Sequence, residues 1–251
     1  MRSAPTLWQY NFSNFNEKAR WALDFKAVAH ARHSLLPTSP RALLFSLRGT
    51  LPVLDLDGRR IVDSSRIIEA LERRWPQPAL YPDDPAERRR ALELEDFFDE
   101  HAGHDLRRVA FLDLREDPDY ASAFLTTGRG PATRRVFRAV LAAPGSMAYA
   151  NRRYRINVDD AARSRVTLTA ALDRIIAERQ PSGYLVGSSF SVADLTAAAL
   201  LFPLAWPAEL QYDYPDPPDS PFMRAFAGHP ALDWIRDIYA RHRGSSAEIA
   251  A

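Results

Sequence analysis

Residues 50–67 read TLPVLDLDGRRIVDSSRI and carry the clearest local structural signals in the chain. Val53–Leu56 and Arg59–Val62 are two short runs with apolar side chains, and Asp57-Gly58 separates them. An Asp-Gly pair between two such runs is typical of the two-residue type I′ turn of a β-hairpin. The residues that follow include three that can cap a helix and three that repeat at helical spacing: Asp63, Ser64 and Ser65, then Ile67, Leu71 and Trp75. The stretch therefore predicts a hairpin followed by a helix.

Upstream of the hairpin, strand and helix signals alternate. Residues 6–10 form a short β-prone run, and a helix is expected to start near Asn14, because Asn14 and Glu17 have the spacing of a capping box. Residues 31–47 carry a weaker mixed signal that Pro37 and Pro40 interrupt. The first 78 residues are therefore expected to form a small α/β domain.

The composition changes after a proline-punctuated linker at residues 79–85, and the β signal ends there. Helical patterns cover residues 86–115, 131–143, 158–180, 191–205 and 230–243, with a short turn near 222–228. The proline-rich segment 207–221 is expected to be a loop, and Gly244–Ala251 is expected to fray. Residues 86–251 are thus predicted to form an all-α domain.

Composition excludes several classes of function. The chain has 251 residues, 33 basic and 32 acidic side chains and a formal charge of +1, so no bulk field favours a nucleic acid or a membrane surface. It contains no cysteine, which rules out disulfides, thiolate metal sites and a cysteine nucleophile. The longest apolar run, Leu195–Trp206, is too short to cross a bilayer, and Met1–Tyr10 does not resemble a secretory signal. A soluble, cytoplasmic protein is expected.

The order of the elements and three motifs resemble the cytosolic glutathione transferase superfamily. Residues 7–20, LWQYNFSNFNEKAR, are similar to its strand–loop–helix segment, in which the thiol-activating residue lies seven positions before a helix arginine. Counting back from Arg20 gives Ser13. Residues 50–54, TLPVL, are similar to the family's cis-proline segment, and Asp63-Ser64 to the acidic-Ser pair that holds the γ-glutamyl end of glutathione. The resemblance implies a thioredoxin-like domain at 1–78, a helical acceptor-binding domain at 86–251 and a homodimer.

Ser13 also makes chemical sense as a thiol activator. A thiol with a pKa of about 8.5 is a poor nucleophile at pH 7, because the thiolate is the reacting form. A hydroxyl at a helix N-terminus can donate a hydrogen bond to that thiolate, and free helix N–H groups add to it. Two alternatives stay open: Ser13 could be only an N-cap, and Tyr10 is a rival hydroxyl, since other branches of the family use a tyrosine there.

The resemblance implies further contacts with glutathione. The backbone of Val53 would pair with the cysteinyl residue of the tripeptide, as in strand addition. Asp63 and Ser64 would bind the ammonium and carboxylate of the γ-glutamyl group. Phe15 would line the tripeptide pocket, and Arg41 would bind the glycyl carboxylate. Glutathione would be a co-substrate, so no cofactor is expected.

Two hypotheses of different class follow. The first is a detoxifying glutathione transferase that attacks an electrophilic, partly apolar small molecule. The second is a non-catalytic binding or assembly module with a transferase-like fold. A metal site at His101 and His104 is disfavoured, because their spacing matches no strong metal motif. Asn14 departs from the family pattern, in which proline commonly follows the serine.

Overall fold

The computed structural model describes residues 4–37, 39–45, 50–143, 145, 148, 152 and 156–250. Its first part is a four-stranded mixed sheet with strand order β2-β1-β3-β4, in which only the β1–β2 pair is parallel. The elements are β1 (Thr6–Gln9), α1 (Asn14–Phe25), β2 (Ala31–Ser34), α2 (Arg41–Phe45), β3 (Val53–Leu56), β4 (Arg59–Val62) and α3 (Ser64–Arg74). This is a thioredoxin-like arrangement, which confirms the predicted fold of this part.

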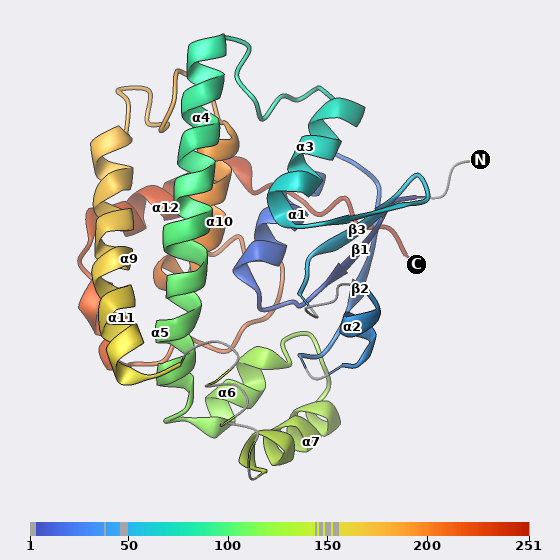
Figure 1. Ribbon diagram of the computed structural model, residues 1–251, viewed down its shortest axis with the longest axis vertical. Helices are drawn as coiled ribbons and strands as arrows, with labels where there is room; N and C mark the ends of the chain where they lie inside the picture. Colours follow the sequence, from blue (N-terminus) through green and yellow to red (C-terminus); the bar gives the residue numbers. More distant parts are fainter. Residues whose placement is uncertain are drawn as a thin grey trace.

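The second part is helical and stands beside the sheet, with α1 and α3 between them (Figure 1). It contains α4 (Pro85–Phe98), a π-helical segment η1 (Asp99–Gly103), α5 (His104–Leu114), α6 (Pro118–Leu125), α7 (Pro131–Ala142), α9 (Val158–Glu178), α10 (Val192–Ala205), α11 (Pro221–Phe226) and α12 (Pro230–His242). The five predicted long helices are therefore present, and the first of them is α4, η1 and α5 in succession. Helix α6 lies outside the predicted set.

The hairpin and the helix after it form as the sequence predicts. Asp57 and Gly58 have φ values of 50° and 77°, as a type I′ turn requires. The Asp63 carboxylate accepts hydrogen bonds from the backbone amides of Ser65 (3.0 Å) and Arg66 (3.3 Å), so it caps α3. The Leu51–Pro52 peptide bond is cis.

Helix α10 lies at the centre of the helical part and is buried along almost its whole length. Its start is held by Asp194, whose carboxylate accepts hydrogen bonds from the amides of Leu185 (2.8 Å) and Ser191 (2.9 Å) and from the Ser191 hydroxyl (2.9 Å). It ends at Trp206, which adopts a left-handed conformation (φ 49°, ψ 59°). Among the described residues, no helix is both long and apolar enough to span a membrane.

The C-terminal segment corrects the expectation of a frayed end. Ile249 donates its amide to the His30 carbonyl (2.9 Å), and the Ala247 amide donates to Asp24 (2.8 Å), so the segment returns to the sheet (Figure 1). Just before it, Arg243 is fully buried and forms ion pairs with Glu17 (2.5 Å) and Asp24 (2.9 Å) of α1. Ion pairs of Arg243 and a hydrogen bond of Ala247 thus hold the C-terminal segment against α1.

Candidate functional site

The register of the sheet brings the predicted site segments to one end of it. Trp8, near the end of β1, is opposite Val53 at the start of β3, and Val53 is opposite Val62 at the end of β4. Three segments therefore leave the sheet at the same end of its strands: the loop to Ser13, the Leu51–Pro52 loop and the start of α3. We call this end of the strands the sheet edge. This edge is where a small ligand could contact all three segments.

Ser13 sits at the N-cap position of α1, but its hydroxyl does not cap the helix. Its backbone is extended (φ −82°, ψ 129°), its carbonyl accepts from the Glu17 amide (2.9 Å), and its side chain makes no capping hydrogen bond. Ser13 is thus the N-cap residue of α1 by position, without a capping hydrogen bond from its side chain. Its hydroxyl is left available to a ligand at the positive end of the helix dipole.

Arg20 positions the loop in front of Ser13. This buried guanidinium donates to the Gln9 side chain (2.8 Å) and to the Asn11 carbonyl (3.1 Å), and it pairs with Glu17 (2.7 Å). The arginine that marks the motif in the sequence thus connects the end of β1 to α1. Because its partners lie on both sides of Ser13, it holds the loop in one conformation.

A hollow of about 70 Å³ opens at Ser13, between the two parts of the chain. The side of α1 contributes Phe12, Ser13, Asn14 and Phe15, and the facing wall is mainly a stripe of α5, namely Leu106, Arg107, Ala110 and Phe111. Arg107 is the basic residue in this lining, and a positive charge there would favour a thiolate. Sequence reasoning missed Arg107. Its spacing from Ala110 and Phe111 indicates that the three side chains share one face of a helix, but not which part of the protein that face contacts.

Helix α1 is docked on the π-helical turn of the facing helix. The Asn14 side-chain amide donates to the Leu200 carbonyl of α10 (2.9 Å), one turn before Pro203. The Phe15 ring lies against Gly103 and 5.1 Å from the ring of His104. Partial burial, together with Arg107 and Arg108, lowers the pKa of His104. Phe15 therefore lines the hollow, and Asn14, the residue that departs from the family pattern, joins the two parts of the chain.

The start of α3 is joined to the helical part by a buried lysine. Lys18 pairs with Glu95 (2.8 Å) and Asp99 (2.8 Å) and donates to the Ser65 hydroxyl (2.7 Å). Burial alone would lower the pKa of Lys18, but the two carboxylates raise it. Ser64 is buried beside this cluster, whereas Asp63 is exposed and occupied in capping α3. Lys18 is a positioning residue that sequence reasoning did not single out.

The structure corrects the expectation for Val53. Val53 lies in the inner strand β3, with Trp8 of β1 on one side and Val62 of β4 on the other. A tripeptide cannot add as a strand there, because both flanks of β3 are already paired at this position. Leu51 precedes the strand, and its carbonyl accepts a hydrogen bond from the Asn16 side chain of α1 (3.2 Å). The backbone at the edge of the site is therefore that of Leu51, two residues before Val53.

Two other candidate residues lie near this edge without joining the hollow. Arg41 is exposed at the start of α2, and Tyr10 stacks on Phe12 with ring centroids 5.7 Å apart. Neither residue is part of the lining at Ser13 among the described residues. Their roles with glutathione stay predictions.

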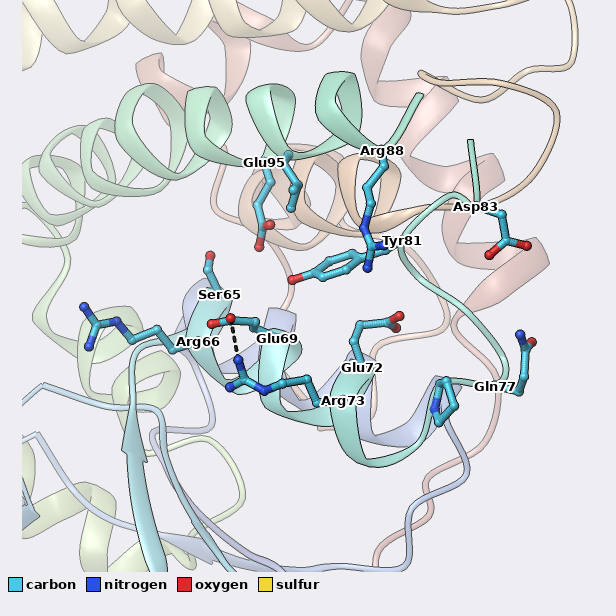
Figure 2. A pocket seen from close by; sticks show the side chains of 12 residues that line it. Ser65, Arg66, Glu69, Glu72, Arg73, Gln77, Tyr81, Asp83, Arg88 and Glu95 are labelled. Atoms are coloured by element: carbon cyan, nitrogen blue, oxygen red, sulfur yellow. Dashed lines mark hydrogen bonds and ion pairs between the residues drawn. The ribbon is translucent and has the colours of Figure 1, made fainter. Parts of the chain in front are cut away.

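A larger cavity, of about 670 Å³, lies between α3 and α4 (Figure 2). Its charges are mostly satisfied within the protein: Arg73 pairs with Glu69 (2.5 Å), and Glu72 and Glu95 pair with buried lysines. Tyr81 reaches into it, with its hydroxyl pointing toward the side of Glu95 (Figure 2). Neither Ser13 nor Phe15 lines this cavity, so it is distinct from the hollow at Ser13, although Ser65 and Arg66 extend it to the start of α3. Within the described ranges, no group of three or more His, Cys, Asp and Glu side chains could hold a metal ion.

Comparison with known proteins agrees with this arrangement. Residues 7–79 match the family model described as glutathione S-transferase, N-terminal domain. A glutathione S-transferase structure from Rhodospirillum rubrum is 21% identical, with a TM-score of 0.60, over 95% of this chain and 89% of that one. One from Methylobacterium radiotolerans, in complex with glutathione sulfonate, is 19% identical, with a TM-score of 0.61, over 99% of both chains. Human glutathione transferase theta-2, in complex with glutathione, is 16% identical, with a TM-score of 0.61, over 96% of this chain and 83% of that one. No curated protein matches the sequence.

Residues 7–79 are therefore similar to the glutathione S-transferase N-terminal domain. The chain as a whole has the glutathione transferase fold, a thioredoxin-like part followed by a helical part, as the sequence predicts.

Proposed function

We propose that the chain activates the thiol of glutathione at Ser13 and transfers the glutathionyl group to an electrophilic, partly apolar small molecule. The observation that carries this proposal is that Ser13 lines the hollow between the two parts while its hydroxyl leaves α1 uncapped. A serine retained only for helix capping would use its hydroxyl on the helix amides. We therefore assign the Ser13 hydroxyl to a hydrogen bond with the bound ligand.

The reaction needs a thiolate, and the site offers three sources of positive potential for one. The Ser13 hydroxyl donates a hydrogen bond to sulfur, the N-terminus of α1 contributes its dipole, and Arg107 faces the same hollow. The thiol proton leaves to solvent. The sulfur lone pair then forms a C–S bond with the electrophilic carbon, and the leaving group departs with the electron pair of the bond that breaks. Lowering the thiol pKa by about two units requires about 2.7 kcal/mol of preferential thiolate stabilisation.

The tripeptide would lie along the sheet edge. The start of α3, with Asp63 and Ser64, is the proposed site of the γ-glutamyl group, and Arg41 stays the proposal for the glycyl carboxylate. The backbone of Leu51, not Val53, is the proposed partner of the cysteinyl residue, because Leu51 lies outside the paired strand. The homodimer and the detoxification role inferred from the resemblance stay predictions.

One observation favours the alternative, a non-catalytic binding module. The hollow at Ser13 is only about 70 Å³, which is small beside the cavities of 300–1,000 Å³ typical of ligand sites. Glutathione would have to extend from it along the open sheet edge. The two hypotheses differ in turnover rather than in fold.

Calorimetric titration with glutathione, followed by a conjugation assay over several electrophiles, tests the proposal. We expect saturable binding and a rate above the uncatalysed reaction. Binding without turnover on any electrophile would support the module. If glutathione does not bind at all, the assignment of the sheet edge to this thiol is wrong.

A substitution at Gly103 is expected to damage the site more than the fold. A Cβ atom on Gly103 would lie 2.3 Å from Cζ of Phe15, so Gly103→Ala must push the Phe15 ring away. The ring lines the hollow beside Ser13, so its displacement changes the wall of that hollow. We expect the free energy of unfolding to fall by about 1–3 kcal/mol, as for other overpacked sites. Glutathione binding, measured by calorimetry, should weaken as well. Gly228→Ala is the matched control, because nothing lies within 4 Å of a Cβ there. Equal glutathione affinity in the two variants would contradict the placement of Phe15.

A further inference from the structure

A second cavity, of about 430 Å³, adjoins the hollow at Ser13 within the helical part. It lies among the C-terminal end of α5, the N-termini of α6 and α11, and the residue that ends α10. The two spaces share Ala110, Phe124 and Pro203 in their walls, so they are neighbours. Its volume is in the range of small-molecule sites.

Aromatic rings form much of the wall of this cavity. Tyr120 stacks on Phe124 with ring centroids 6.1 Å apart, and the Trp206 ring lies 6.2 Å from that of Phe124. Phe222 of α11 adds a fourth ring. Tyr120 and Trp206 are only half-buried, so part of each ring stays open to a ligand. The face of an aromatic ring attracts a cation, and tryptophan does so most strongly.

The charged residues of the same wall are all acidic. Among its described lining residues are four carboxylates, Asp113, Glu116, Asp117 and Asp219, and no arginine, lysine or histidine. Asp219 pairs with Arg224 (2.5 Å), and Asp117 caps α6 through the Tyr120 amide (2.9 Å). Asp113 and Glu116 form no ion pair with any residue of the described part of the chain.

The position of these two carboxylates strengthens the negative potential. Asp113 lies in the last turn of α5 and Glu116 just beyond it, at the negative end of that helix dipole. The positive N-terminal ends of α6 and α11 are capped by the side chains of Asp117 and Ser220. Burial, and after it the carboxylates Asp117 and Asp216, raise the pKa of the Tyr120 phenol. The cavity is thus apolar and aromatic within, and negative at its rim.

We propose that this cavity binds aromatic organic cations such as aryl quaternary ammonium compounds. Aromatic rings solvate the positive group and its apolar substituents, and Asp113 and Glu116 balance the charge. Neutral aromatics gain neither the attraction of the ring faces for a cation nor the charge balance, and the carboxylates repel aromatic anions. Such cation binding also has a consequence for the reaction, which rests on the proposed transferase function. The acceptors of the thiolate at Ser13 are then aromatic cations that carry an electrophilic carbon.

Binding is tested without glutathione on the full-length protein. Ligand-observed NMR titrations compare benzyltrimethylammonium with neopentylbenzene, its neutral isostere, and with benzenesulfonate as the anion. We expect the cation to bind about tenfold more tightly than the isostere at low salt, a difference of about 1.4 kcal/mol. The preference should shrink as salt rises, because the rim carboxylates are partly exposed. Equal affinity for cation and isostere, or tighter binding of the anion, overturns the proposal.

Substitutions test whether the preference for the cation over its neutral isostere depends on Asp113 and Glu116. In Asp113→Asn combined with Glu116→Gln, the affinity for the cation should fall most of the way to that of the isostere, whose own affinity should not change. Glu93→Gln, on an exposed surface of α4 outside this cavity, removes a negative charge elsewhere and should leave the preference intact. A preference that the double substitution does not reduce would place the cation elsewhere and reject this cavity.

Turnover measurements distinguish the cationic acceptor class from the transferase activity itself. The electrophiles are 4-(trimethylammonio)benzyl chloride and 4-tert-butylbenzyl chloride, with each rate divided by its uncatalysed rate with glutathione. In both, the thiolate sulfur bonds to the benzylic carbon and chloride leaves with the electron pair. A higher kcat/KM for the cation, lost in the double variant, supports the acceptor class. Equal conversion of both rejects the acceptor class but retains the transferase. Conversion of neither also rejects the acceptor class, and the wider panel of electrophiles then decides the transferase. In either case the NMR result decides whether the cavity binds the cation.

Discussion

Ser13→Ala is expected to lower the turnover of glutathione conjugation about a hundredfold near neutral pH. A hydrogen bond to a charged acceptor is worth about 1.5–3 kcal/mol, and its loss raises the pKa of the bound thiol and depletes the thiolate. The loss should shrink at high pH, where the thiol ionises without help. The affinity for glutathione should change less, because most of the proposed contacts lie at the start of α3 and at Leu51. The pH dependence of kcat/KM and a calorimetric titration measure the two effects.

The structure adds a second readout to this test. Because the Ser13 hydroxyl does not cap α1, its removal should change the free energy of unfolding by less than the roughly 1 kcal/mol that a lost cap costs. A capping role would produce the opposite pattern, in which stability falls while the pH profile stays the same. Tyr10→Phe is the paired control and should be mild. If Tyr10→Phe abolishes activity and Ser13→Ala does not move the pH profile, the tyrosine is the activator.

Arg243→Met is expected to reduce the free energy of unfolding by about 3–5 kcal/mol, because it leaves buried carboxylates without a counter-charge. Arg243 is fully buried, and its guanidinium pairs with Glu17 and Asp24 and lies 5.6 Å from the Trp21 ring. Urea denaturation at pH 7 measures the loss. Arg241→Met is the matched control: it lies two residues earlier, in the last turn of α12, but pairs with Asp237 at the surface, where such a pair is worth under about 1 kcal/mol. Similar urea midpoints for the two variants would show that the buried network does not carry this stability.

The same network predicts how stability depends on pH. Burial would raise the pKa of Glu17, but Arg243 and Arg20 outweigh it and lower that pKa from 4.5 to about 2. The ionised carboxylate therefore contributes stability that is present above about pH 4.5 and is lost as the pH falls toward about 2. In Arg243→Met the decline should begin at a higher pH, because one of the two cations that lower the pKa is gone. Urea midpoints measured between pH 7 and pH 3 give the comparison.

Local sequence patterns were sufficient for most of the fold. The Asp57-Gly58 turn, the Asp63 cap of α3 and the apolar periodicity of the long helices each depend on residues a few positions apart. Such interactions form in the same way wherever the segment is placed, so they can be read without knowing the tertiary structure. Helix α6 escaped prediction because it has only eight residues. The expectation for the β2 and α2 region stayed vague because prolines interrupt a weak signal.

The candidate site was only partly accessible in this way. Ser13 and the start of α3 were found because a motif marks them, and the register of the sheet places them at one edge. Val53 lies in a strand that is paired on both sides, which only the tertiary structure shows, so the proposed backbone contact moves to Leu51. Arg107 was missed, because the hollow exists only once α5 stands opposite α1.

By itself, then, the sequence determined the elements, their caps and their order, since those follow from neighbours along the chain. Only the tertiary structure decided which charges are buried together and which rings surround a cavity. Arg243 reads as an ordinary basic residue at a helix end, yet packing places it against carboxylates more than 200 positions away. Likewise, Asp113 and Trp206 line one cavity although nothing in their local sequence links them. Burial and charge pairing depend on distances in space, and those are set when all the helices pack together.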